Sequence, residues 1–491
     1  MTVDSDPALA TGPLQVAADR LPAESVRVLG VLLVGAFVVI LNETALNVAL
    51  SRIMTDLMID ERTVQWLTTG FMLTMAVVIP VTGWLMERFS TRTVFTLAMA
   101  LFSVGTLVAA LGWAVPSLLL GRIIQASGTA IMMPLLMTTV MELVPSGQRG
   151  RVMGTISMVI SVAPAIGPTL SGVILQFLPW RFVFVLVLPI AVAIMLVGHR
   201  RVPNLNTPVP VRLDVLSVPL AGVGFGGLVY GLSLVGSPTA GWLLEAALGV
   251  GMAGLGLFVW RQVLLQRRDA ALLDLRTFTY PIFTTALGVM AIAMAVLFGT
   301  IIALPLLLQQ VLHAEPLFVG LLLLPGALLT GLLGPVVGRL YDRVGPRWLI
   351  VPGALAVAGA LALFSQVAVT TPWWHLLVAH LMLSLGLAFM FTPLFTITLG
   401  ALPPHLYGHG SAMVGTVQQV AGAAGTALFV TVMSAVAATQ PTRLTTEESL
   451  AAGARMAFLA VGVLWLAGIA ATLFLRKPQD SHPTAQPAGR P

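Results

Sequence analysis

The chain has 491 residues and a formal net charge of +6; 57% of its residues are hydrophobic and only 9% are charged. That composition cannot be divided between the core and the surface of a soluble globule, so it excludes a soluble protein and indicates an integral membrane protein. The absence of cysteine excludes disulfides, thiol chemistry and a cysteine-based zinc site.

Fourteen segments are apolar and long enough to cross a hydrocarbon layer about 30 Å thick as helices. We therefore expect an all-α membrane protein with fourteen spans. The expected spans cover residues 27–49, 65–86, 93–112, 117–140, 151–176, 181–198, 214–236, 242–262, 282–311, 317–338, 348–368, 374–400, 411–437 and 454–475.

These spans divide into six, two and six. We expect tails over 1–26 and 477–491, a bundle of six helices over 27–200, two inserted helices with basic loops over 201–280, and a second six-helix bundle over 281–476. Most of the 25 lysine and arginine residues then fall on the side of the membrane that holds both tails. Because basic loops resist translocation, both termini are predicted to be cytoplasmic. Topology thus explains the basic composition, and we expect no nucleic-acid partner.

Span one contains LNETALNVAL at 41–50, which places Glu43 deep in an apolar helix and Asn47 one turn later on the same face. A carboxylate binds its proton more tightly when buried and less tightly beside an arginine. A glutamate that is alternately exposed to water and shielded can therefore load and release a proton. We expect this role for Glu43; a hydrogen-bonding structural role is the alternative.

Two charged decapeptides, GWLMERFSTR at 83–92 and GRLYDRVGPR at 338–347, join the second and third spans of the two bundles. Internal repeats of this kind are typical of transporters, whose substrate site lies between the repeats. The repeat pairs Gly83 with Gly338, Glu87 with Asp342, Arg88 with Arg343, and Arg92 with Arg347.

In the first decapeptide, Gly83 lets span two approach a neighbouring helix closely. We expect Glu87 to lie near a helix amino terminus in the opposite bundle. Arg88 and Arg92 are expected to pair with Glu87 and with lipid phosphates. The cluster would then hold the cytoplasmic gate closed when the protein opens outward; a simple topological anchor is the alternative.

Span four contains GRIIQASGTA at 121–130, with Arg122 inside an apolar helix and Gln125 on nearly the same face. An intramembrane arginine that faces the bundle needs a partner, and Glu43 is the natural candidate. The alternative is that Arg122 extends to the outer interface.

Span five contains APAIGPTLSG at 163–172. Its Pro164, Gly167, Pro168 and Gly172 are expected to kink or thin the helix and allow tight packing. An ordinary packing kink is the alternative.

A substrate cavity is less sharply marked. Methionine-rich, adaptable walls suit weakly selective binding. The polar or soft side chains that we expect to line the cavity are Asn42, Asn47, Gln125, Met290, Met294, Phe298, Gln418 and Gln419.

Enzyme signatures are missing from the sequence. It has no GxxxxGK[ST] phosphate-binding loop, so the chain does not encode ATP-driven export. His405 and His409 are four residues apart but have no acidic ligand beside them, and we expect no metal site.

The decapeptides and the motifs of spans one, four and five together resemble the major facilitator superfamily, over nearly the whole chain. The fourteen spans resemble its drug:proton antiporter branch, which includes QacA- and EmrB-type multidrug exporters. The chain departs from the family pattern at Ser90, Ala126 and Ser171, each in place of a glycine, and at Asn42, where the family's common acid stands one position before Glu43.

The resemblance implies two six-helix bundles with two extra central helices, working by alternating access in the plasma membrane. It implies export of small hydrophobic or cationic toxic compounds in exchange for protons, with no other cofactor. Arg122 is then implicated in proton coupling, and the span-five motif in sealing the path against leak.

Three other functions stay open: export of one physiological metabolite, lipid or antibiotic; proton-coupled import; and a membrane sensor without transport. The sequence also leaves open whether a periplasmic adaptor protein is needed.

Overall fold

The computed structural model describes residues 21–235, 241–439 and 445–476, and all regular structure in these ranges is helical. Thirteen of its helices are long and apolar enough to cross a membrane. The expected span 214–236 instead contains a shorter apolar helix, Ser217–Ser233. The prediction of an all-α membrane fold is confirmed, with thirteen long helices and this shorter one in place of fourteen equivalent spans.

The helices that precede residue 202 pack on one another, and we call them the N-terminal group. They are α1 (Ala23–Leu57), α2 (Glu61–Val78), η1 (Ile79–Val81), α3 (Thr82–Arg88), α4 (Thr91–Ala110), α5 (Val115–Leu143), η2 (Ser146–Gln148), α6 (Arg149–Phe177), α7 (Phe182–Val185) and α8 (Val187–Arg201).

The last six long helices form a second set, which we call the C-terminal group. Its elements are α12 (Pro281–Gln310), α13 (Pro316–Val344), α14 (Arg347–Phe364), α15 (Trp373–Gly400), η6 (Pro404–Leu406), α16 (Tyr407–Thr439) and α17 (Thr446–Thr472).

Between the groups, the chain forms an inserted pair of antiparallel helices. One helix runs through α9 (Ser217–Ala221), the π-helical η3 (Gly222–Gly226) and α10 (Gly227–Ser233), and the other is α11 (Gly241–Leu265), which is followed by η4 (Gln266–Arg268) and η5 (Leu275–Thr279). The helices approach closely at glycines: a Cβ atom on Gly227 would lie 2.9 Å from the Gly251 Cα. Small residues permit this backbone packing without a water-driven hydrophobic effect.

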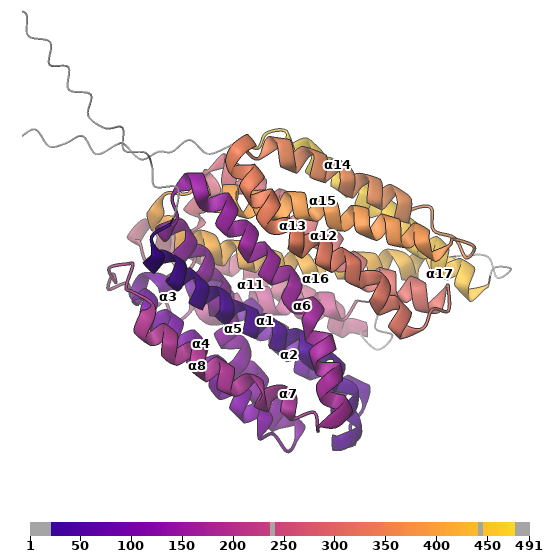
Figure 1. Ribbon diagram of the computed structural model, residues 1–491, viewed down its shortest axis with the longest axis horizontal. Coiled ribbons are helices and arrows are strands. Elements are labelled where there is room, and N and C mark those ends of the chain that lie inside the picture. The colour runs from indigo at the N-terminus through magenta and orange to yellow at the C-terminus, as the bar shows by residue number, and fades with distance from the viewer. Residues whose placement is uncertain (1–20, 236–240, 440–444, 477–491) are drawn as a thin grey trace, which may run out of the picture.

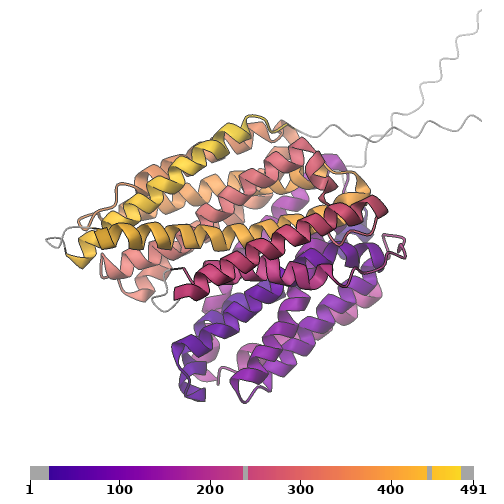
Figure 2. The ribbon, with the colours of Figure 1, turned by 180° about the vertical axis from the view of Figure 1, so that it is seen from behind.

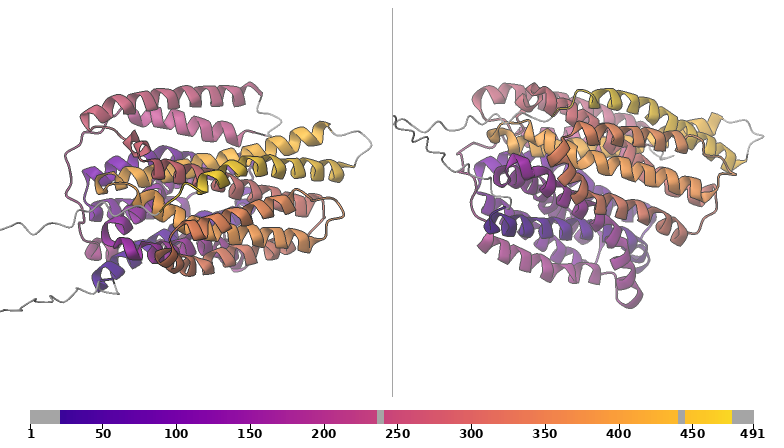
Figure 3. Two further views of the ribbon diagram at one scale, coloured as in Figure 1. Left: turned by 90° about the horizontal axis from the view of Figure 1, so that it is seen from above. Right: turned by 45° about the horizontal axis from the view of Figure 1, so that its top comes forward.

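The two groups lie side by side, the N-terminal group from indigo to magenta and the C-terminal group from orange to yellow (Figure 1). Seen from behind, α11 crosses the back of the molecule between them (Figure 2). The inserted pair forms a separate layer along one edge (Figure 3). Its α10 contacts both α2 and α16, so the pair touches both groups.

The helices start where the local chemistry satisfies their free amides. Prolines occupy the first turns of α5, α12 and α13, where a missing N–H is not needed. The Asp60 side chain accepts a hydrogen bond from the Thr63 amide at the start of α2. Backbone groups within the helices are satisfied internally, because lipid offers no partners.

The two decapeptide loops lie at the same end of the bundle, which we call the signature end. There, Arg343 and Arg347 line a shallow cavity with Arg476, which follows α17 in the chain. In the first loop, Ser90 has a φ of −66° and its side chain caps α4 by accepting from the Thr93 amide. In the second loop, Gly345 has a φ of 81°, which favours glycine. The first loop therefore accommodates serine because its backbone at this position differs from that of the second.

Asp214 anchors the inserted pair. Arg261 donates two hydrogen bonds of 2.6 Å to its carboxylate, and these hold the pKa of Asp214 below its usual range.

We expect Asp214→Asn to lower the free energy of unfolding by about 1–3 kcal/mol near neutral pH. Since the folded-state pKa is depressed, this stabilisation exists above the unfolded pKa and is lost as the pH falls through the folded value. Thermal unfolding should therefore show the variant and the wild type converging in acid. The exposed Asp269→Asn should have a smaller effect, and equal effects would contradict the anchoring role.

Candidate functional site

Arg122 is buried in the middle of the N-terminal group, with 2% of its surface exposed. Its Nη1 donates to the Gln125 side-chain oxygen, and its Nε donates to the Leu67 carbonyl of α2 at 3.4 Å. The guanidinium carbon lies 3.9 Å from the centre of the Phe71 ring, a cation–π contact. Arg122 therefore faces the bundle, and the alternative that it extends to the outer interface is wrong.

Gln125 extends this contact into a network across α1, α4 and α5. Its Nε2 donates to the Asn42 Oδ1 at 2.7 Å and to the Thr106 Oγ1 at 2.8 Å. Asn42, Gln125 and Thr106 are all fully buried. The Asn42 side-chain Nδ2 has no hydrogen-bond partner among the described residues, so both of its N–H donors are unused. In a low dielectric, a polar group without a hydrogen-bond partner is costly to bury.

Glu43 lies beside this network but is not part of it. The ion pairs of the described residues do not include one between Glu43 and Arg122, so the expected partner acts through its charge and not through a direct contact. The reason is geometric: neighbouring helical residues point about 100° apart, and Asn42, not Glu43, faces Gln125. Glu43 is partly exposed and still interacts electrostatically with Arg122. A half-buried glutamate thus sits next to a buried cation.

The span-five motif packs on the turn of α1 that holds Glu43. A Cβ atom on Gly167 would collide with the Thr44 hydroxyl and would lie 3.1 Å from the Leu41 carbonyl oxygen. Pro164, Pro168 and Gly172 lie on exposed parts of α6, and a Cβ atom on Gly172 would meet nothing within 4 Å. Only Gly167 of the four predicted residues makes the close helix contact that the motif suggested.

Glu87 of the first decapeptide reaches the opposite group. His409 lies in the first turn of α16 and contacts the Glu87 Oε1 through Nε2 at 2.9 Å. The His409 Nδ1 accepts from the Asp274 amide, which leaves the proton on Nε2 and makes it the donor to Glu87. Gly83 lies under the ring, where a Cβ atom would be 2.6 Å from Nδ1. The imidazole is therefore held between α3 and the segment after α11.

Asp342 of the second decapeptide makes the equivalent contact across the molecule. Its carboxylate accepts from the Gly150 and Arg151 amides, at 2.9 and 2.8 Å. These amides belong to the first turn of α6, where the helix dipole favours a negative charge. Both acidic residues of the repeat thus contact a helix amino terminus of the opposite group.

Arg88 and Arg92, which were expected to pair with Glu87, do not form ion pairs with it. Arg92 donates from Nε to the Val202 carbonyl at 2.8 Å. Arg88, Arg343 and Arg347 are exposed at the signature end. Glu87 is paired with His409 instead, because the opposite group supplies the nearer donor.

Backbone contact between α6 and α13 forms the rest of this boundary, and we call it the glycine seam. Gly150 and Gly154 of α6 face Gly334 and Gly338 of α13 so closely that any Cβ atom there would collide with a backbone carbonyl or the Asp342 side chain. A further contact between the groups joins α5 to α16, where Thr138 donates to the Ser411 hydroxyl at 2.9 Å. The groups are therefore tightly closed at the signature end.

The residues predicted to line a cavity are separated in the structure. Met290 and Met294 are buried within the C-terminal group, where the Gln418 Nε2 contacts the Met290 sulfur at 3.4 Å. Gln419 crosses to the N-terminal group, with Nε2 3.5 Å from the Met72 carbonyl oxygen. The residues that lie together in the Arg122 network are Asn42 and Gln125, whereas Asn47 and Phe298 are exposed. Met290 and Met294 thus pack in a core and do not line an open wall.

Sequence reasoning missed His409, which was considered only as a metal ligand, and Phe71. The available signal for His409 was its position just after Pro404 and Tyr407, at a helix start on the same side as the decapeptides. Phe71 carried no signal in one sequence, because an aromatic residue in an apolar helix is ordinary.

A bundle of long apolar helices, two copies of one charged loop and a buried arginine network are typical of a multi-pass membrane protein of the secondary-transporter class. The family model described as "Major Facilitator Superfamily" matches residues 32–426. The chain belongs to the Major Facilitator Superfamily.

Relatives cover the chain almost completely. It is 42% identical over 457 residues to the uncharacterized MFS-type transporter YcnB of Bacillus subtilis, covering 92% of this chain and 95% of the relative. It is 38% identical over 457 residues to the lincomycin resistance protein LmrB of Listeria monocytogenes, covering 91% and 95%. The crystal structure of the human organic anion transporter MFSD10 is similar in fold, with a TM-score of 0.64 at 17% identity, covering 92% of this chain and 100% of that one.

Proposed function

We propose that the chain exports hydrophobic or cationic toxic compounds across the plasma membrane in exchange for protons, by alternating access. The observation that carries this proposal is the placement of the partly exposed Glu43 beside the buried Arg122 network. The lincomycin-resistance name of a relative at 38% identity supports the drug class.

Arginine placement supports a cytoplasmic position for the signature end, and with it for both termini. The closed glycine seam and the contacts of Glu87 and Asp342 lie at this end. With this orientation we propose that the closed signature end belongs to the state closed toward the cytoplasm, and that Glu43 exchanges protons with the outer side in that state.

In this cycle Glu43 takes up a proton from the outer side while the drug leaves. The bundle then rocks so that the signature end opens, and the proton is released to the cytoplasm as a new drug molecule enters. The fixed charge of Arg122 favours the ionised carboxylate. Proton release and drug binding therefore compete at one place, which is what an exchanger requires, and the proton is the only coupling ion proposed.

Glu43→Gln tests this proposal. Proteoliposomes that contain the purified chain should show ethidium efflux driven by an imposed proton gradient, with a matching change of internal pH. We expect the variant to lose gradient-driven efflux by at least about a hundredfold, because it has no proton to exchange. The matched control is Glu245→Gln. Glu245 also lies in an apolar helix, but this helix belongs to the inserted pair, so the variant should retain efflux. Full gradient-driven efflux by Glu43→Gln would overturn the assignment of Glu43.

A narrower range of substrates is a second candidate, favoured by the relative named for resistance to a single antibiotic. The same liposomes distinguish the two: efflux of lincomycin without efflux of ethidium would replace the multidrug function with this narrower one.

A further inference from the structure

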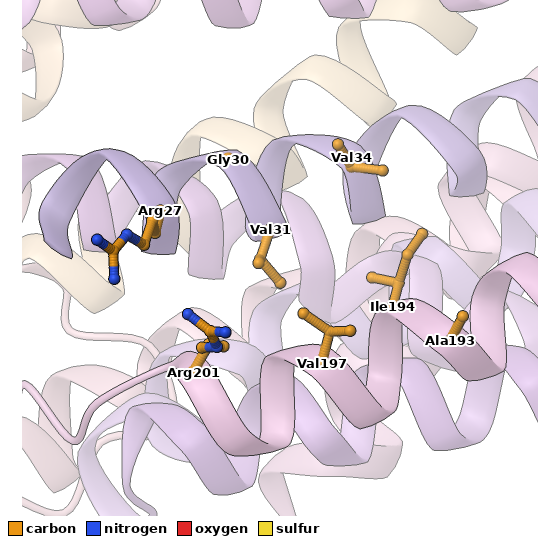
Figure 4. Close-up of a pocket in the computed structure, with 8 residues that line it drawn as sticks. All are labelled: Arg27, Gly30, Val31, Val34, Ala193, Ile194, Val197 and Arg201. Carbon is orange, nitrogen blue, oxygen red and sulfur yellow. The ribbon is translucent and has the colours of Figure 1, made fainter. Parts of the chain in front are cut away.

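A hollow groove lies between α1 and α8 at the signature end, away from the Arg122 network. Figure 4 shows its walls, with Arg27 and Arg201 together at one end. The cavity volume is about 430 Å³. It is lined by Arg27, Gly30, Val31, Val34, Ala193, Ile194, Val197 and Arg201.

The groove follows from the spacing of residues on two antiparallel helices. Arg27, Gly30, Val31 and Val34 recur at helical intervals on one face of α1, and Ala193, Val197 and Arg201 do so on α8. Gly30 keeps the space open, since a Cβ atom there would meet nothing within 4 Å. One and a half turns deeper the space is filled: a Cβ atom on Gly35 would collide with the Met132 side chain of α5 and would lie 3.7 Å from Ile194 of α8.

Charge marks one end of the groove and apolar side chains mark the other. In the described part of the chain, neither the Arg27 nor the Arg201 guanidinium has a carboxylate or hydrogen-bond partner. From Arg27 to Val34 the helix rises about 10 Å, which is most of the half-thickness of a bilayer core of about 30 Å. The groove therefore starts at headgroup depth and runs along the upper part of a lipid chain.

We propose that this groove is a binding site for one anionic phospholipid of the leaflet at the signature end. The lipid phosphate lies between Arg27 and Arg201, and an acyl chain lies along Gly30, Val34 and Val197. Guanidinium groups bind phosphate oxygens by paired, charge-assisted hydrogen bonds. Basic pockets between membrane helices at this depth are suited to anionic headgroups. The bound lipid would link the first and last long helices of the N-terminal group, and the site does not depend on the proposed drug export.

Photocrosslinking tests the site directly. The full chain is reconstituted in vesicles of phosphatidylcholine and phosphatidylglycerol, at three to one, with a trace of phosphatidylglycerol that carries a photoreactive acyl chain. Peptide mapping should find label on α1 and α8 around Gly30 and Val197, enriched above the label on exposed parts of α11. Unlabelled phosphatidylglycerol should compete, and phosphatidylcholine should not.

Two pairs of variants separate this site from general membrane contact. Gly30→Leu fills the groove without colliding with the protein, and it should reduce the α1 label at least about fivefold; Gly249→Leu, on an equally open part of α11, should not. Arg201→Gln should weaken competition by phosphatidylglycerol about fivefold, the value of one basic residue near a charged surface. Arg200→Gln removes the same charge from the same helix end but lies outside the groove, and it should leave competition unchanged.

Three results would overturn the proposal. Equal competition by phosphatidylcholine would mean that no headgroup is recognised. Competition by glycerol 3-phosphate in solution would indicate a site for free phosphates and not for a lipid. Unchanged labelling in both Gly30→Leu and Arg201→Gln would show that the groove is not the place where the lipid binds.

Discussion

Arg122→Gln is expected to abolish gradient-driven efflux, with a loss of at least about a hundredfold, while the protein still folds and inserts. The guanidinium joins α5 to α2 through the Leu67 carbonyl and to the Gln125 side chain, and it is the buried cation next to Glu43. Glutamine keeps a polar side chain but removes the charge. Without it the ionised form of Glu43 loses its electrostatic partner, so proton release into the cytoplasm becomes unfavourable.

The stability cost of this change is modest, and this allows the two roles of Arg122 to be separated. Hydrogen bonds between membrane helices contribute about 0.6 kcal/mol on average. Losing the two bonds and the Phe71 contact should therefore cost roughly 1–3 kcal/mol of unfolding free energy. A shift of that size lowers the melting temperature by several degrees and does not by itself remove activity at 25 °C.

The decisive measurement is efflux against pH, combined with thermal unfolding in detergent. Arg122→Lys should keep part of the activity and shift its pH profile, since lysine retains the charge but not the planar fork of donors. Arg181→Gln removes a guanidinium with two hydrogen bonds elsewhere in the N-terminal group, and it should change stability without changing the pH profile. If Arg122→Gln exchanged drug for protons at the wild-type rate, Arg122 would be a structural residue only.

The repeat, the helices and the burial of Arg122 could be predicted from the sequence because each depends on local pattern. The decapeptides are recognisable at constant spacing, and an arginine inside an apolar helix must find partners. The identity of the partners of Arg122 depends on how each neighbouring helix is rotated about its own axis. Asn42 and Glu43 are neighbours in sequence but point about 100° apart, and this alone decided which of them joined Gln125.

Contacts between the two groups were predicted in kind but not in detail. The sequence predicted that Glu87 lies near a helix amino terminus in the opposite group. In the structure Glu87 does lie at the start of α16, but its partner there is the His409 side chain and not the backbone amides. No local pattern connects Glu87 to His409, because the two are brought together only by the docking of the groups. The glycine seam was invisible for the same reason: glycine is common in membrane helices, and only the packed structure distinguishes Gly334 from the open Gly288.

Gly334→Leu is expected to prevent closure of the signature end and to stop transport. A side chain at Gly334 would collide with the Gly154 carbonyl of α6, and backbone cannot move aside as a side chain does. Overpacking of this kind costs about 1–3 kcal/mol or more in the closed state. The open state carries no such cost, because the leucine is then released from the seam. The ratio of closed to open molecules should fall by about fivefold to a hundredfold or more, since each 1.4 kcal/mol is a factor of ten.

Spin labels on the exposed ends of α3 and α14 report this equilibrium through their distance distribution. The wild type should show a short-distance population at the signature end, and Gly334→Leu should convert it to a longer one. Gly288→Leu, at an open position of α12, is the matched control and should leave the distribution unchanged. Asp342→Asn should give an intermediate shift, because it removes the charge at the α6 amino terminus but keeps one acceptor. A short-distance population that persists in Gly334→Leu would mean that the groups close by a path that does not use the seam, and alternating access about α6 and α13 would have to be abandoned.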